Sequence, residues 1–322
     1  MPLRPLIPVI AGPTAGGKTG LAIACAKLAE ASGLTPHAAV ISADAFQVYR
    51  GLDIASAKPT REERDGVPHH LIDIVEPTEP FTVAQWLELA TQRIDEIEAA
   101  GGWPIIAGGT HLYIKALIDG LFDGPPADDA LREQLRAMPP AELRAELELV
   151  DPQAAQRIHP ADQRRTIRAI EVHRITGTPI SDHQNQWDSG TGPLADRLLL
   201  VTLQWPTEAI NTRINARVKA MVQAGLVEET RHLWEANRLG PQAAQALGTK
   251  QILAHLQSGF PLDSTIERTK IETRRFAKNQ RTWLRRLASQ AASSPKRLAF
   301  HPESEDAGTF TQTLVQQCFT TD

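Results

Sequence analysis

Short apolar runs alternate with longer stretches of helical periodicity over the first 122 residues. The runs at 6–11, 38–42 and 104–107 have the length and composition of buried strands. The stretches with helical periodicity cover 21–29, 81–99 and 112–121. Such alternation predicts an α/β fold with a parallel sheet and helices on both of its faces.

The pattern changes after the turn-forming residues Asp123-Gly124-Pro125-Pro126. Residues 127–178 are rich in Arg, Glu, Ala and Leu with helical periodicity, and the polar stretch 177–193 is expected to be a loop. The apolar run 198–203 predicts the next strand, at which the chain returns to the sheet. The predicted domains are an α/β core of 1–122 and 205–322 and a helical insertion domain of 123–204.

The C-terminal part of the predicted core is mostly helical. Helical periodicity covers 207–288, with interruptions near residues 240 and 260 where Gly and Pro occur. From residue 288 the chain is rich in Ser and Ala and then acidic, so we expect little order there apart from a short strand at 298–300.

Composition is that of a globular protein. The 322 residues are 42% hydrophobic and 22% charged, enough for one large core or two domains. No apolar run has membrane-spanning length, and residues 1–10 lack a secretory signal pattern. Cys25 and Cys318 form no metal or disulfide pattern, which fits a reducing compartment. We expect a cytoplasmic monomer with no membrane partner.

Charge is distributed unevenly along the chain. Residues 205–300 carry 16 Lys and Arg against 7 Asp and Glu, a net charge of +9, whereas the whole protein has a net charge of −4. A basic block on a mildly acidic protein is typical of a site for an anionic polymer, although a solvated cationic face has the same composition.

The strongest motif is Gly12-Pro13-Thr14-Ala15-Gly16-Gly17-Lys18-Thr19, which fits the pattern G-x-x-x-x-G-K-[ST]. It lies between the first predicted strand and a predicted helix, where such a loop forms a phosphate cradle. Backbone N–H groups of the loop point at the anion, and Lys18 adds a charge that reaches the terminal phosphates. The hydroxyl of Thr19 is suited to bind Mg²⁺. The motif therefore predicts binding of a polyphosphate or nucleotide.

Two further groups follow predicted strands and should face the same cleft, because ligands of parallel sheets bind at the carboxyl ends of the strands. Asp44 follows the second strand, where a carboxylate can hold a metal ion or accept a proton from a nucleophile. Gly108-Gly109-Thr110 opens a predicted helix and offers a second anion site.

A long basic stretch lies between Arg268 and Arg286. Arg274, Lys278, Arg281 and Arg285 recur at helical spacing and so share one face of a helix, which suits RNA phosphates. We expect apolar residues to anchor the opposite side of this helix: Phe276, Trp283, Leu284 and Leu287. A second basic patch lies in the insertion: Arg164, Arg165 and Arg168.

These features leave several functions open. A P-loop kinase that uses ATP on a small metabolite would need the phosphate cradle and an acid, but neither the basic helix nor the insertion. A nucleotide-gated RNA-binding module would need the cradle and the basic helix, but no catalytic acid.

Taken in order along the chain, the motifs resemble the tRNA dimethylallyltransferase family over roughly residues 8–286. Besides the glycine-rich loop, the matching motifs are Ser42-Ala43-Asp44, Gln47-Val48-Tyr49, Ala57-Lys58-Pro59, Pro68-His69-His70-Leu71-Ile72-Asp73, Gly108-Gly109-Thr110-His111-Leu112-Tyr113, Asp151-Pro152, Ile158-His159-Pro160, Arg168-Ala169-Ile170-Glu171-Val172, Arg213-Ile214-Asn215, Arg217-Val218, Ala277-Lys278 and Gln280-Arg281-Thr282-Trp283.

This resemblance implies a P-loop NTPase-like fold and transfer of a dimethylallyl group from dimethylallyl diphosphate to N6 of the adenosine next to the anticodon of tRNA. Mg²⁺ would assist at the diphosphate, and the insertion would close over the anticodon stem-loop. The resemblance implies catalytic roles for Asp44, Thr110 and Arg213. The residues expected to contact tRNA are Asp44, Ala45, Phe46, Gln47, Thr110, Arg132, Gln163, Arg164, Arg165, Thr166, Ile167, Arg217, Lys250, Arg274, Lys278 and Arg281.

The chain departs from the family pattern at three positions. Ala45 stands where Ser is usual, Thr249 where Tyr is usual, and Asn279 where a basic residue is usual. An adenylate isopentenyltransferase, which acts on free AMP or ATP, would share the cradle and the acid. A mononucleotide, however, cannot fill the insertion and the basic helix.

Overall fold

A computed structural model describes residues 4–122, 124–184, 192–289 and 295–320. The chain divides into two compact units, one of residues 1–118 with 193–322 and one of residues 119–192. Both boundaries lie earlier than those of the predicted insertion, 123–204. The strand at 198–203 consequently belongs to the unit that contains the sheet, because it pairs with two other strands there.

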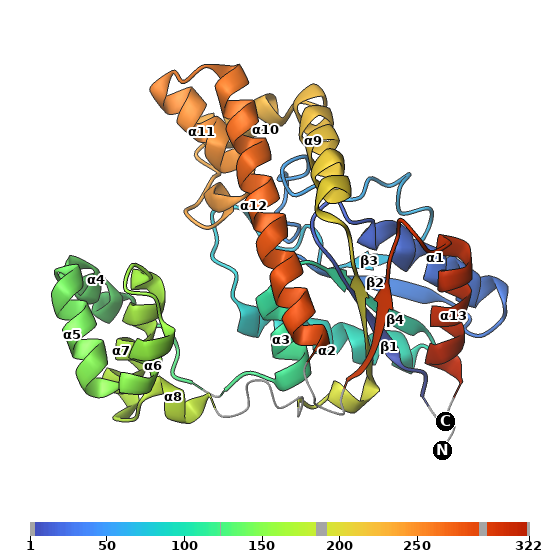
Figure 1. Ribbon diagram of the computed structural model, residues 1–322, viewed down its shortest axis with the longest axis horizontal. Helices are drawn as coiled ribbons and strands as arrows, with labels where there is room; N and C mark the ends of the chain where they lie inside the picture. Colours follow the sequence, from blue (N-terminus) through green and yellow to red (C-terminus); the bar gives the residue numbers. More distant parts are fainter. Residues whose placement is uncertain (1–3, 123, 185–191, 290–294, 321–322) are drawn as a thin grey trace. The chain divides into compact units, whose positions relative to one another are not determined.

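The first unit is built on a six-stranded parallel sheet with the order β3-β2-β4-β1-β5-β6 (Figure 1). This confirms the predicted fold class. The strands are β1 (Ile7–Ala11), β2 (Ala38–Ala43), β3 (His69–His70), β4 (Trp103–Gly108), β5 (Leu198–Leu203) and β6 (Lys296–Phe300).

Two prolines lie in central strands, where a missing N–H would weaken the sheet. Pro8 belongs to β1 and Pro104 to β4, yet these two strands pair with each other only from Val9 and Ile106 onward. Both prolines therefore precede the pairing between β1 and β4, while Pro8 is in register with Leu199 of β5 and Pro104 with Ala39 of β2.

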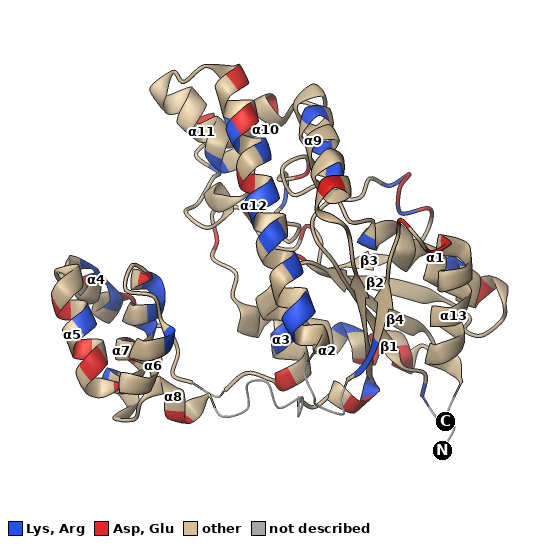
Figure 2. Cartoon of the chain, viewed as in Figure 1, with Lys and Arg blue, Asp and Glu red and all other residues tan. Residues whose placement is uncertain are grey.

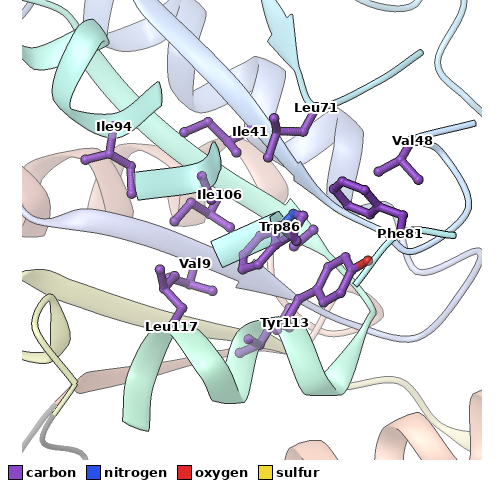
Figure 3. Close-up of a cluster of buried hydrophobic side chains, with 14 of the residues drawn as sticks. Val9, Ile41, Val48, Leu71, Phe81, Trp86, Ile94, Ile106, Tyr113 and Leu117 are labelled. Carbon is purple, nitrogen blue, oxygen red and sulfur yellow. The ribbon is translucent and has the colours of Figure 1, made fainter. Parts of the chain in front are cut away.

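Alternate residues of the strands pack against opposite helical layers, as expected for side chains that point to opposite faces of a sheet. Val9 packs toward α2 (Val83–Ala99) and α3 (His111–Asp119), while Ile10 packs toward α1 (Lys18–Ala31). Figure 3 shows part of the first of these layers, with the buried rings of Phe81, Trp86 and Tyr113. Trp86 and Tyr113 stack there with ring centroids 4.6 Å apart, and Trp86 Nε1 donates to the Ser42 carbonyl at 2.9 Å. These contacts fix β2 and α3 beside each other.

The C-terminal segment is more ordered than its composition suggested. β6 extends the sheet beside β5, and α13 (Ala307–Phe319) packs against α1. The expectation of little order apart from a short strand was therefore wrong for the described part of the segment, and residues 290–294 and 321–322 lie outside the described residues. Phe310 and Leu314 of α13 are buried because they complete the apolar layer over β1 and β5.

Among the described residues, four helices and one short 3₁₀ turn lie between β5 and β6 and confirm the predicted helical C-terminal region. They are α9 (Thr207–Gln223), α10 (Leu226–Glu235), η2 (Ala243–Gln245), α11 (Thr249–Ser258) and α12 (Leu262–Ala288). Another 3₁₀ turn, η1 (Ala195–Arg197), precedes β5.

The buried side of α12 is not the one its apolar residues suggested. Leu284 and Leu287 are buried and Trp283 is half-buried, as expected, but Phe276 is 40% exposed. The buried stripe continues instead through Thr265, Thr269, Thr273 and Ala277. The Thr269 and Thr273 hydroxyls donate to carbonyls four residues earlier, at 2.9 and 2.7 Å. The prediction that Phe276 anchors the helix was thus wrong, because threonines with satisfied hydroxyls pack in its place.

The second unit is a small helical bundle. Its core contains Leu135, Leu143, Leu147 and Ile170. The expected loop at 177–193 contains the short helix α8, and residues 185–191 lie outside the described residues. The helices are α4 (Asp129–Ala137), α5 (Pro140–Val150), α6 (Pro152–Arg157), α7 (Gln163–Thr176) and α8 (Ile180–His183). In neither unit is a described helix long and apolar enough to cross a membrane.

Candidate active site

The glycine-rich loop connects β1 to α1 and closes on itself. Gly16 N donates to the Pro13 carbonyl at 3.0 Å, and Ala15 and Gly17 have φ angles of 61° and 88°. The left-handed backbone at Gly17, directly before α1, turns the chain so that the first N–H groups of the helix face outward from the carboxyl edge of the sheet. Their partial positive charge suits an anion.

Lys18 is the first residue of α1 and its side chain folds back over the loop. Its Nζ donates to the Pro13 carbonyl at 2.9 Å. Burial, assisted by the nearby Arg217 guanidinium and opposed by the Asp44 carboxylate, lowers the pKa of Lys18 to about 8. Lys18, Asp44 and Arg217 are thus close enough to affect one another electrostatically, and the site has an excess of positive charge where an anion would bind.

Asp44 follows β2 and forms a turn with the residues after it. Its Oδ1 accepts from Phe46 N at 2.9 Å and from Gln47 N at 3.4 Å. Thr110 approaches the same turn from β4, since its Oγ1 accepts from Ala45 N at 2.9 Å and its N donates to the Ala43 carbonyl at 3.2 Å. The structure therefore brings Asp44 and Thr110 together, although 65 positions separate the bonded residues Ala45 and Thr110.

Two glycines permit this approach. A Cβ at Gly108 would lie 2.1 Å from the Ala43 carbonyl oxygen, and a Cβ at Gly109 would lie 2.6 Å from Gln280 Nε2 and 3.5 Å from Lys18 Nζ. A larger residue at 108 would push the end of β4 away from β2, and one at 109 would displace the Gln280 amide. The Gly108-Gly109-Thr110 turn is accordingly part of the site's wall.

Arg213 and Trp205 hold the outside of the glycine-rich loop. Arg213 Nε donates to the Ala15 carbonyl at 2.8 Å, and Trp205 Nε1 donates to the Gly16 carbonyl at 3.0 Å. The Arg213 guanidinium lies 4.7 Å from the Trp205 ring centroid, a cation–π arrangement. Because Arg213 and Trp205 hold these two carbonyls on the outer side of the loop, the N–H groups of the loop are oriented toward its inner side.

The segment after the Asp44 turn is held in place by two charged side chains, Lys58 and Glu229. The Lys58 ammonium is buried and contacts Asp53 at 2.6 Å, Asp73 at 2.5 Å and the Tyr49 carbonyl. Glu229 of α10 accepts from the backbone N–H groups of residues 53, 54 and 55 at 2.8, 2.7 and 3.0 Å. Burial raises the pKa of Glu229, and the three donors oppose that rise.

The basic residues of α12 lie along the length of the helix (Figure 2). Arg274 Nη1 donates to Asn215 Oδ1 at 2.6 Å and Arg281 Nη2 to Thr207 Oγ1 at 2.9 Å, so both are oriented by α9. Lys278 is exposed, and so is Lys250 at the start of α11. Together they give α12 a positive surface beside α9.

Residues of the second unit predicted to contact tRNA differ in their surroundings. On α7, Gln163, Arg164 and Arg165 are exposed, whereas the side chains of Thr166 and Ile167 are buried in the unit's own core. Arg132 is held by the buried Glu171 at 2.8 Å, and Glu171 also pairs with Arg168. These two arginines lower the pKa of Glu171 against the effect of its burial.

The three departures from the family pattern differ in position. The backbone N–H of Ala45 donates a hydrogen bond to Thr110 Oγ1, so the backbone at position 45 has a structural role. Thr249 is fully buried and its hydroxyl has no hydrogen-bond partner. Asn279 is exposed on α12. Position 249 therefore lies inside the helical C-terminal region rather than on its surface.

Sequence reasoning assigned Arg217 to tRNA and overlooked Gln280. In the structure Arg217 lies beside Lys18 and Asp44, and the Gln280 side chain contacts two loops of the site. The spacing of Arg213 and Arg217 by one helical turn was the available signal for Arg217. For Gln280 the signal was its place in the motif Gln280-Arg281-Thr282-Trp283, which matches the family pattern.

The described residues contain no cluster of three His, Cys, Asp or Glu side chains able to hold a metal ion. Thr19, in the first turn of α1, is the protein oxygen at the loop that suits a divalent cation. Such a donor set fits a cation that takes most of its ligands from phosphate oxygens and water, as Mg²⁺ does.

Comparisons with known proteins identify relatives of the chain over most of its length. The family model described as IPP transferase matches residues 47–287. The tRNA dimethylallyltransferase of Geobacillus kaustophilus (strain HTA426) is 45% identical over 285 residues, which cover 87% of each chain. The tRNA isopentenylpyrophosphate transferase structure from Bacillus halodurans has a TM-score of 0.67 at 35% identity and covers 97% of this chain and 95% of that one.

A further solved structure, of a eukaryotic dimethylallyltransferase acting on tRNA, has a TM-score of 0.79 at 28% identity. The match covers 96% of this chain and 77% of that chain.

Proposed function

The chain belongs to the IPP transferase family, and on that premise we propose that it transfers a dimethylallyl group from dimethylallyl diphosphate to tRNA. The acceptor is N6 of the adenosine on the 3′ side of the anticodon, and diphosphate is released. The observation that carries the proposal is the convergence of Lys18, Asp44 and Thr110 at the carboxyl ends of three neighbouring strands.

The glycine-rich loop and Lys18 bind the diphosphate. Cleavage of the allylic C–O bond leaves positive charge on carbon and an electron pair on the departing diphosphate. Fixed donors around that group stabilise its charge as it develops, which is commonly the largest catalytic contribution. Arg217 adds a second positive charge beside Lys18, and Arg213 keeps the loop in shape.

Asp44 accepts the proton that N6 loses as the new C–N bond forms. Two backbone N–H groups hold one of its oxygens, so the carboxylate is oriented before substrate binds. Thr110 fixes the turn that contains Asp44. Thr19 and the diphosphate oxygens would hold Mg²⁺, which supplies charge neutralisation when bound.

The surface of α12 beside α9 supports RNA as the acceptor, since its basic residues suit a phosphate backbone. Arg274, Lys278, Arg281 and Lys250 contact the anticodon stem-loop, as do Gln163, Arg164 and Arg165 of the second unit. The adenosine must leave the stack of the anticodon loop to reach Asp44. We also expect the protein to act in the cytoplasm as a monomer.

An acceptor assay tests the proposal. The protein is incubated with Mg²⁺ and labelled dimethylallyl diphosphate, together with unmodified tRNA or with AMP, and in parallel with labelled ATP. We expect label on tRNA. Label on AMP alone would instead identify an adenylate isopentenyltransferase, and ATP turnover without prenyl transfer would identify a kinase or a nucleotide-gated module.

A further inference from the structure

Gln280 lies on the buried side of the basic helix α12 and touches both walls of the phosphate site. Its Oε1 accepts from Thr14 N in the glycine-rich loop at 2.8 Å, and its Nε2 donates to the Gly109 carbonyl at 2.9 Å. Both ends of the amide are thus hydrogen-bonded. Because Gln280 is only 2% exposed, water does not compete for these bonds.

The hydrogen bond from Gln280 to the Gly109 carbonyl requires a glycine at position 109. A Cβ on Gly109 would lie 2.6 Å from Gln280 Nε2, so the glycine is what allows the amide to reach this carbonyl. Three residues further along α12, the Trp283 ring stacks on His111 with centroids 4.5 Å apart and planes 14° apart. Burial lowers the pKa of His111 to about 4, so the imidazole in this stack is neutral at physiological pH. Helix α12 is thereby fixed to the turn that carries Thr110 at two points.

These contacts form a continuous connection. It runs from Thr14 through Gln280 to Gly109, and from Thr110 to the backbone of Ala45 beside Asp44. We propose that Gln280 is a positioning residue that holds the diphosphate cradle and the Thr110–Asp44 turn in register, and that links both to the helix whose outer face binds RNA. This inference rests on the proposed function only for the identity of the reaction whose kcat is measured.

Gln242 provides a matched control. Its Oε1 accepts from Phe81 N at 3.1 Å and its Nε2 donates to the Phe81 carbonyl at 2.8 Å, so it also joins two segments through both ends of its amide. It has no hydrogen bond to the glycine-rich loop. Gln280→Met and Gln242→Met each remove two hydrogen bonds with little change in volume, and the loss of stability should be smaller at Gln242, which is half-buried.

The two variants are compared by prenyl transfer kinetics, by pyrophosphate binding with Mg²⁺ and by denaturant unfolding. We expect Gln280→Met to lower kcat by about tenfold to 100-fold and to weaken pyrophosphate binding, with the KM for tRNA within about twofold of wild type. Gln242→Met should leave kcat, pyrophosphate binding and the KM for tRNA near wild type. Gln280→Asn, whose amide is one carbon shorter and can reach only one loop, should have an intermediate kcat and provides the same readout if the Met variant does not fold.

A double-mutant cycle with Thr110→Ala separates positioning from general destabilisation. If Gln280 acts through the Gly109–Thr110 turn, the loss of kcat from Thr110→Ala should be at least about threefold smaller in the Gln280→Met background than in wild type. Additive losses would overturn the inference, and so would Gln280→Met kinetics that match those of Gln242→Met. Pyrophosphate binding requires no prenyl transfer, so a wild-type protein inactive on tRNA would refute the proposed function while still allowing the role of Gln280 to be tested.

Discussion

Raising the pH through 8 should slow the reaction of this protein with its diphosphate donor, because Lys18 then loses its charge. Burial of the ammonium group is the main reason that its pKa is lowered from 10.5 to about 8, and the Arg217 charge is the second. A diphosphate needs the charged form, which alone attracts its terminal oxygens.

The magnitude follows from the fraction of Lys18 that is protonated in the protein before the donor binds. With a pKa of about 8, about half of the molecules carry the charge at pH 8 and about a tenth at pH 9. Since kcat/KM reports the protein without bound donor, its value for dimethylallyl diphosphate should fall about tenfold between pH 7 and pH 9. Bound diphosphate raises the pKa of Lys18, so kcat should begin to fall only at higher pH.

The assay is a pH profile of kcat/KM for the donor at saturating tRNA, with circular dichroism at each pH to check the fold. Lys18→Arg is the control variant: its guanidinium stays protonated, so a slower enzyme should show a flat profile from pH 7 to about pH 10. Arg217→Gln should move the fall to higher pH, because it removes a charge that lowers the pKa of Lys18. A flat wild-type profile, or a fall near pH 8 that persists in Lys18→Arg, would refute the reasoning.

The same pKa has a consequence for stability. Folding lowers the pKa of Lys18. Its contribution to the free energy of unfolding is therefore fully present above the unfolded pKa of 10.5 and is lost as the pH falls through about 8. At pH 7 the cost is at most about 3 kcal/mol, and water that reaches the half-buried side chain reduces it. A bound diphosphate offsets this cost, so the site is stabilised by its ligand.

Three further changes test other parts of the site. Asp44→Asn should lower kcat by about 10²- to 10⁴-fold with tRNA affinity within about twofold, because the proton acceptor is lost while the turn is kept; equal losses in both would make Asp44 a binding residue. Lys58→Met should lower the free energy of unfolding in urea by about 1 to 2 kcal/mol, since the Tyr49 carbonyl and two partly exposed carboxylates lose their shared ammonium, and a loss below about 0.5 kcal/mol would show that the lysine is dispensable. Arg274→Gln with Lys278→Gln should weaken tRNA binding and reduce the slope of log Kd against log salt by about 1.5; an unchanged slope would place the RNA elsewhere.

The sheet and its phosphate loop could be predicted because their signals are local. An apolar run followed by the glycine motif and a helix-forming stretch specifies β1, the loop and α1 without knowledge of the rest of the chain. The run at 198–203 likewise became β5 with the predicted bounds. Helix α13 carried a local signal too, with Phe310, Leu314 and Cys318 at helical spacing after an Asp306 N-cap, but the acidic and Ser-rich composition before it obscured the pattern.

The features that could not be predicted depend on contacts between distant segments. The Gln280 amide joins residues 171 and 266 positions away, and no pattern along α12 indicates which side of the helix will meet them. Hydrophobicity alone favoured Phe276 as a buried residue, but the threonine stripe packs more closely and exposes it. Arg217 likewise gains its place beside Lys18 only from the way α9 packs over the loop.

The central claim is that the glycine-rich loop removes diphosphate from an allylic donor while Asp44 prepares an adenine amine. The most direct measurement is mass spectrometry of the nucleosides from tRNA incubated with the protein, dimethylallyl diphosphate and Mg²⁺, with released diphosphate quantified in the same sample. We predict that one adenosine next to the anticodon gains a dimethylallyl group for each diphosphate released. Unmodified adenosine in every tRNA, with ATP hydrolysed when it is supplied, would contradict the account.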